Sequence, residues 1–289
     1  MRARLDGEPP ASGRAARDLR CGRTEIVFVF AARLSPRKTR KADSGETNAV
    51  AEAAPPLTAA VPAGIDRVLD FRLAHAAARD AVLTPFDPTA LAGEILALGT
   101  GVFTVNSASA DRAQYLQRPD SGRQLSAGSR AALTDFAAGR PPVDLVIIAA
   151  DGLSTQAVRQ IVPLLRGLLP ALQGAGWELA PVIVASQARV ALQDEIGNLL
   201  QARLSLILLG ERPGLGSADS LGAYFTWAPR PGRSDAERNC LSNIRAAGLP
   251  PAAAAVRLFH LLTESRRRGL SGTSLKDETP LPGLQHRRD

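Results

Sequence analysis

Three nearly uninterrupted apolar runs in the second half of the chain constrain its fold most strongly. They span residues 144–149, 181–185 and 204–209, and a helical pattern follows each of the first two. Strands that are apolar on both faces and alternate with helices are typical of a parallel sheet covered on both sides. The spacing therefore predicts an α/β domain over residues 143–289, with a Rossmann-like parallel sheet and helices on both faces.

Residues 61–142 are predicted to form a helical segment before that domain. Leu69 and Leu73 belong to an apolar series with three- and four-residue spacing, which predicts a helix with a buried stripe. A second helix is expected over residues 88–98 and a short strand over residues 101–106.

The remaining helices and strands are predicted from the spacing of apolar residues and from helix-capping residues. A strand is expected over residues 223–228. Ser234 and Glu237 match a capping box at the start of a helix. The helices expected in this half of the chain span residues 155–173, 190–202, 234–245 and 251–268.

The basic charge of the chain is concentrated at its N-terminus. Residues 1–41 hold eleven of the 35 Lys and Arg residues but four of the 28 Asp and Glu residues, so the rest of the chain is neutral, with 24 of each sign. A polyanion-binding domain carries its charge on a folded face, which argues against nucleic-acid binding by the main body. Residues 1–60 are predicted to form a disordered basic extension, and nucleic-acid binding by this tail stays open as an alternative.

Cysteine and histidine usage argues against a disulfide framework and a metal site. The only cysteines are Cys21 and Cys240, far apart in the sequence, and the three histidines are scattered. Few cysteines suit a reducing cytoplasm. No apolar run approaches the roughly 20 residues that a membrane span needs. We therefore expect a cytoplasmic chain with no membrane segment and no metal ligands.

Three loops follow the ends of the predicted parallel strands, where ligands bind in open α/β sheets. They are Asp151-Gly152, Ser186 to Val190, and Gly210 to Gly214. A ligand crevice is expected where they meet. The chain lacks a phosphate-binding loop, a complete dinucleotide fingerprint and a Gly-x-Ser-x-Gly elbow.

Cys240 is the one candidate nucleophile. In a helix of residues 234–245, the helix amides and Arg238 would lower the pKa of its thiol. No histidine lies near it in the sequence, and a buried structural cysteine is the competing interpretation. A stand-alone α/β enzyme that uses Cys240 is therefore kept as an alternative function.

Several stretches resemble the small (light) subunit of ethanolamine ammonia-lyase. The similarity covers most of residues 61–278, and its most specific part is the run from Gly210 to Arg245. Gln193 departs from the family pattern, which has glycine there. The stretches that carry the resemblance include "LDFRLAHAAARDAV", "SADRAQYLQRPDSGRQLS", "DLVIIAADGLS" and "LLGERPGLGSADSLGAYFTWAPRPGRSDAERNCLSNIR".

The resemblance implies a role in the adenosylcobalamin-dependent conversion of ethanolamine to acetaldehyde and ammonia by a radical mechanism. A TIM-barrel large subunit would perform the chemistry, so no catalytic residue is expected here. The small subunit would close over the cobalamin at the interface, with Val190, Glu211 and Cys240 as its contacts. The resemblance further implies that the two subunits form a hetero-oligomer, expected to be a dodecamer. The complex is expected in the cytoplasm, inside or outside a bacterial microcompartment.

Overall fold

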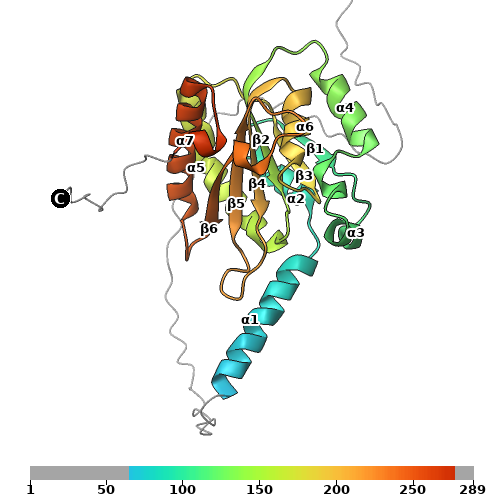
Figure 1. Cartoon of the computed structure of the whole chain (residues 1–289), viewed down its shortest axis with the longest axis vertical. Helices are drawn as coiled ribbons and strands as arrows, with labels where there is room; N and C mark the ends of the chain where they lie inside the picture. The colour runs from blue at the N-terminus through green and yellow to red at the C-terminus, as the bar shows by residue number, and fades with distance from the viewer. Residues whose placement is uncertain (1–64, 277–289) are drawn as a thin grey trace, which may run out of the picture.

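A six-stranded sheet forms the centre of the molecule (Figure 1). The computed structural model describes residues 65–276, and the predicted disordered extension of residues 1–60 lies outside them. The strand order is β1-β3-β2-β4-β5-β6. The strands are β1 (Val102–Asn106), β2 (Val143–Ala150), β3 (Val182–Ser186), β4 (Ala202–Gly210), β5 (Leu221–Trp227) and β6 (Arg238–Ile244).

The α/β class is confirmed, but the predicted Rossmann-like parallel arrangement is not, because the sheet is mixed. Strands β1, β3, β2 and β4 run parallel, whereas β5 and β6 are antiparallel additions. A parallel connection needs a crossover of about a dozen residues or more, usually a helix. The loop of residues 211–220 between β4 and β5 contains no helix. The chain therefore turns back on itself after β4.

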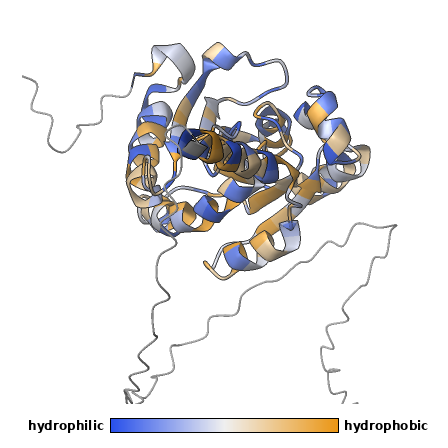
Figure 2. Ribbon diagram, turned by 90° about the horizontal axis from the view of Figure 1, so that it is seen from below, coloured by the Kyte–Doolittle hydropathy of each residue, from blue (hydrophilic) through white to orange (hydrophobic). Residues whose placement is uncertain are grey.

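Helices cover both faces of the sheet, as predicted. The helices α2 (Pro88–Leu96), α5 (Ile161–Gly174) and α7 (Pro251–Arg268) pack on one face, and α4 (Ala127–Ala137) and α6 (Leu192–Leu199) on the other. Each face of the sheet has its own hydrophobic core, and alternate residues of a strand belong to opposite cores, because successive side chains of a strand point to opposite faces. In Figure 2 the strands are largely hydrophobic, while the helices mix the two colours.

The first helix, α1 (Ile65–Leu83), is not covered along its apolar stripe. Leu69 is 54% exposed and Leu73 is 72% exposed, so the predicted burial of this stripe is wrong for the chain by itself. Figure 1 shows that α1 projects away from the body and joins it at its C-terminal end. The apolar spacing therefore identifies an apolar surface on α1, but it does not show what covers that surface. Among residues 65–276, no helix combines the length and apolarity of a membrane span.

The helix predicted over residues 234–245 is a further correction. The capping box of Ser234 and Glu237 is present, but it starts only a short 3-10 helix, Asp235–Glu237, which leads into β6. Leu241 and Ile244 imitate a helical spacing because a β-bulge lies between them, opposite β5. An extra residue in one strand keeps both side chains on the same face of the sheet.

Candidate functional site

The buried carboxylate of Asp151 joins the loops that follow β2 and β3. Its Oδ1 accepts hydrogen bonds from the backbone N–H groups of Gly152 (3.0 Å), Gln187 (2.7 Å) and Ala188 (3.3 Å). Its Oδ2 accepts one from Arg112 Nη1 at 3.1 Å. Burial raises the pKa of Asp151 to about 6, against the opposing effects of Arg112 and the three amides. Both carboxylate oxygens of Asp151 are thus occupied by hydrogen bonds within the protein, and these bonds hold the ends of β2 and β3 together.

The loops after β2 and β4 touch through their backbones. Leu153 N donates to Gly210 O at 2.8 Å. A Cβ on Gly210 would lie 2.0 Å from Ser154 O, and one on Gly152 would lie 2.3 Å from Gly210 O. The three predicted loops therefore do converge. However, this backbone contact leaves no room for a ligand between the ends of β2 and β4, which form one part of the predicted crevice.

Cys240 lies on β6 and is exposed, directly opposite Tyr224 of β5. Its Sγ is 3.0 Å from Ser242 Oγ. Desolvation of the partly covered sulfur raises the pKa of the thiol against the opposing hydrogen bond with Ser242, and the charge of Glu211 adds to the rise. The predicted lowering is therefore wrong. No helix carries Cys240, and the guanidinium of Arg238 is committed to Asp194.

Glu211 follows β4 and is held at the end of the sheet. Its Oε2 accepts hydrogen bonds from Ser220 Oγ at 2.5 Å and from the backbone N–H of Asn243 at 3.1 Å. Asn243 belongs to the bulge in β6 and has a left-handed backbone, with φ of 56°. The bulge thus directs a backbone donor to Glu211, which is a known use of such irregularities.

Gly222 and Tyr224 of β5 connect Glu211 with Cys240. A Cβ on Gly222 would lie 2.7 Å from Tyr224 Cε2 and 3.0 Å from Glu211 Oε1, so both side chains lie across this glycine. Burial raises the pKa of Tyr224, and its interactions with Cys240 and Glu211 raise it further. Glu211, Gly222, Tyr224 and Cys240 therefore form one group on the sheet, called here the β5–β6 cluster.

Val190 lies outside this cluster, at the start of α6. It lines a cavity of about 350 Å³ together with Arg189 and Arg238. Val190 and Tyr224 both pack against the core on the α4 and α6 side of the sheet. The structure thus brings Glu211 and Cys240 together, and it places Val190 on the same face in a neighbouring cavity.

A buried ion pair fixes α6 relative to the β5–β6 cluster. Arg238 donates from both terminal nitrogens to the two oxygens of Asp194, each at 2.7 Å. Gln193 is buried beside it, and with its side-chain amide in the orientation that its neighbours satisfy, the amide nitrogen donates to the carbonyl oxygen of Tyr224 at 3.0 Å. The start of α6 is therefore tied to β5 and β6 at two successive residues.

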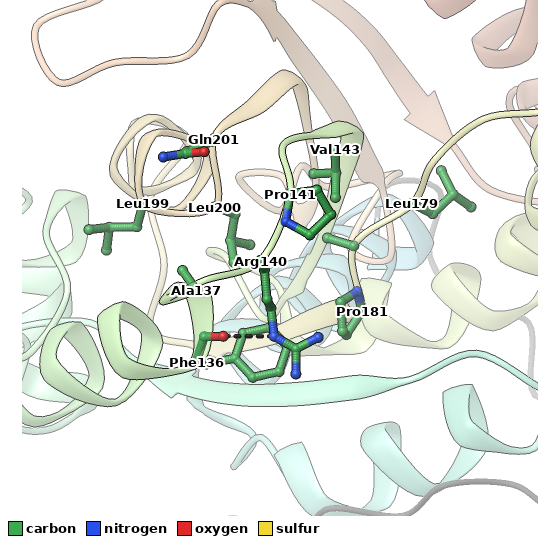
Figure 3. A pocket seen from close by; sticks show the side chains of 11 residues that line it. Phe136, Ala137, Arg140, Pro141, Val143, Leu179, Pro181, Leu199, Leu200 and Gln201 are labelled. Atoms are coloured by element: carbon green, nitrogen blue, oxygen red, sulfur yellow. Dashed lines mark hydrogen bonds between the residues drawn. The ribbon is translucent and has the colours of Figure 1, made fainter.

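Two further cavities are not lined by Val190, Glu211 or Cys240. One is apolar, has a volume of about 140 Å³, and lies at the amino ends of the strands near Val143 and Pro181 (Figure 3). Arg140 lies across it and donates from Nε to Phe136 O at 2.7 Å. The other, of about 380 Å³, is lined by Asp151, Ser186 and Gln187, so a cavity is present where the predicted loops after β2 and β3 meet.

The raised pKa of Cys240 predicts slow alkylation near neutral pH. In a Cys21→Ser background, the rate of iodoacetamide labelling should rise with a midpoint above the ordinary thiol value of about 8.5, because only the thiolate reacts. Mass spectrometry of the labelled peptide over a pH series measures it. A midpoint below that value would contradict the environment described here and would favour a nucleophilic Cys240.

The fold and the cluster define a class of protein before any comparison is made. Among residues 65–276, no three His, Cys, Asp or Glu side chains gather as metal ligands. The carboxylate, phenol and thiol lie on a sheet edge whose β6 side chains at Cys240 and Ser242 are exposed. This is an α/β protein with a group of polar side chains exposed at the edge of its sheet.

The chain belongs to the ethanolamine ammonia-lyase light chain family, whose model matches residues 58–276. It is 51% identical over 219 residues to an ethanolamine ammonia-lyase small subunit from Ralstonia nicotianae, covering 75% of this chain and 81% of that one. A Pseudomonas aeruginosa small subunit is 52% identical, with coverages of 75% and 80%. A Pseudomonas fluorescens small subunit is 49% identical, with coverages of 76% and 81%.

Proposed function

We propose that this chain is the small subunit of an adenosylcobalamin-dependent ethanolamine ammonia-lyase and that the β5–β6 cluster and Val190 contact the cobalamin. The observation that carries the proposal is the meeting of Glu211 and Cys240, 29 residues apart in the sequence, across Tyr224 on an open sheet face. Family membership supports the reaction, the deamination of ethanolamine to acetaldehyde and ammonia.

The residues of the cluster suit the edge of a corrin ring. Such a ring carries amide side chains, whose N–H groups are natural donors to a carboxylate. Glu211 Oε2 already accepts two hydrogen bonds from the protein, while Oε1 faces Gly222 and Tyr224. When bound, adenosylcobalamin supplies the radical chemistry. This chain would position the ring and exclude water from one side of it.

A large subunit is the proposed partner, because the relatives carry the name small subunit. We propose a TIM barrel that holds the substrate and the catalytic groups, assembled with this chain as a dodecamer, with or without an enclosing microcompartment. The exposed apolar side chains of α1 support such an assembly, since uncovered patches of this kind mark interaction surfaces.

The isolated chain should self-associate. Phe71 and Leu73 are 55% and 72% exposed on α1, so water contacts apolar surface that a partner would cover. Light scattering should show species larger than a monomer, and the double substitution Phe71→Ser, Leu73→Ser should reduce their size. A stable wild-type monomer that binds cobalamin tightly by itself would contradict the shared site.

Co-expression with a large subunit tests the proposed function. Ethanolamine should yield acetaldehyde only when both chains and adenosylcobalamin are present, and Cys240→Ser should retain turnover at saturating cofactor. The alternative is a stand-alone enzyme with Cys240 as nucleophile. Turnover by this chain without a partner, abolished by Cys240→Ser, would establish that alternative.

A further inference from the structure

A cavity lined by four arginines lies beside the β5–β6 cluster. Its volume of about 350 Å³ falls within the range of small-molecule sites. Arg238 connects it to the cluster, because Arg238 and Cys240 are two residues apart on β6 and alternate strand residues share a face. The residues that line it are Pro119, Arg123, Arg189, Val190, Ala191, Arg233, Ser234, Asp235 and Arg238.

The positive charge of this cavity is only partly neutralised. Arg238 pairs with Asp194 and Asp235, and Arg233 pairs with Glu237. In contrast, neither Arg123 nor Arg189 has a carboxylate within 4.0 Å among residues 65–276. Two guanidinium groups in the wall are therefore left without an anionic partner.

The side chain of Arg189, which has no anionic partner, is fixed by contacts with Tyr115. Its guanidinium lies over the Tyr115 ring, 4.2 Å from the centroid, and Nη2 donates to Tyr115 O at 3.0 Å. Its Nε is buried and has no hydrogen-bond acceptor among the described residues. A buried donor without an acceptor is costly, and its presence points to a ligand that supplies one.

Backbone N–H groups at the start of α6 also line the arginine cavity. The N–H groups of Val190 and Ala191 donate no hydrogen bond within residues 65–276. Free amides at the start of a helix favour an anion. Arginine forks and helix-start amides together match the oxygen geometry of a phosphate group.

We propose that this arginine cavity binds the phosphate group of a ligand. Its assignment to one ligand rests on the proposed function: cobalamin carries a phosphodiester in its nucleotide tail, and the cavity adjoins the proposed corrin contacts through Val190 and Arg238. A free phosphate compound is the other possible source of the same chemistry.

The test uses the assembled complex with two matched variants. Arg123→Gln removes one of the two unpaired cavity guanidiniums, while Arg166→Gln removes an exposed arginine on α5, across the sheet. Each complex is titrated spectroscopically with adenosylcobalamin and with adenosylcobinamide, which lacks the nucleotide phosphate. Binding of inorganic phosphate to each complex is measured by calorimetry.

Arg123→Gln should raise the Kd for adenosylcobalamin about 10- to 100-fold, the loss expected for one hydrogen bond between charged groups. Arg166→Gln should change no Kd, and adenosylcobinamide should bind all three complexes equally. Weaker phosphate binding in Arg123→Gln with unchanged cobalamin binding would leave the phosphate site standing with a free phosphate compound as its ligand. Unchanged binding of both phosphate and cobalamin would overturn the proposal. Failure of the wild-type complex to bind any corrinoid would instead refute the proposed function, and the phosphate titration would still decide the cavity.

Discussion

Arg238→Met should lower the free energy of unfolding by about 3–5 kcal/mol, the range for removing one partner of a buried ion pair. Both side chains of the Arg238–Asp194 pair are only 3% exposed. Methionine keeps much of the apolar stem but leaves the Asp194 carboxylate buried without its cation. Urea denaturation at submicromolar protein, followed by fluorescence of Trp177 and Trp227, measures the change.

Two controls separate this electrostatic effect from lost packing. Adding Asp194→Leu to Arg238→Met should restore most of the stability, because a buried ion pair can be replaced by apolar residues at little cost. In Arg238→Met alone, Asp194 should hold its proton to a higher pH than in the unfolded chain. The deficit should therefore shrink as the pH falls. A loss below about 1 kcal/mol would show that α6 does not depend on this pair.

Gly210→Ala should destabilise the protein by roughly 3 kcal/mol or more, the upper end of the cost of overpacking. Its Cβ would lie 2.0 Å from Ser154 O and 2.7 Å from Asp151 O. Both obstacles are backbone atoms, so no side-chain rotation relieves the clash. The loop after β2 would have to move away from the end of β4, and the loop's hydrogen bond from Leu153 N to Gly210 O would be lost.

Gly216→Ala is the matched control, because a Cβ at Gly216 meets nothing within 4 Å. It makes the same chemical change in the loop that follows β4. Its urea midpoint should equal that of the wild type. A Gly210→Ala midpoint that also equals the wild type would contradict the close approach of the two loops.

The parallel half of the fold follows from the sequence because its signals are local. The apolar runs of β2, β3 and β4 are buried on both faces and alternate with helices, so period and composition suffice. The antiparallel half was harder to predict. The bulge between Leu241 and Ile244 gives the apolar residues of β6 a helix-like spacing. The sequence pattern alone therefore does not distinguish this strand from a helix.

The candidate site depends on contacts that sequence reasoning did not contain. Glu211 and Cys240 were named from the family resemblance, but Tyr224 was missed because its pairing with Cys240 requires β6 to be a strand. The arginine cavity had a weak signal in the arginines of separate loops. That signal does not show that Arg189 is stacked on Tyr115 with one nitrogen unpaired.

The central claim is that the β5–β6 cluster contacts adenosylcobalamin, and the most direct test titrates the Glu211→Ala complex with this cofactor. A hydrogen bond to an ionised group contributes about 1.5–3 kcal/mol. Its loss should therefore raise the half-saturation concentration about 10- to 100-fold. Subunit assembly and turnover at saturating cofactor should stay close to wild type, and Arg212→Ala, at the exposed neighbour, should change nothing. An unchanged half-saturation concentration in Glu211→Ala would remove the cluster from the cofactor site.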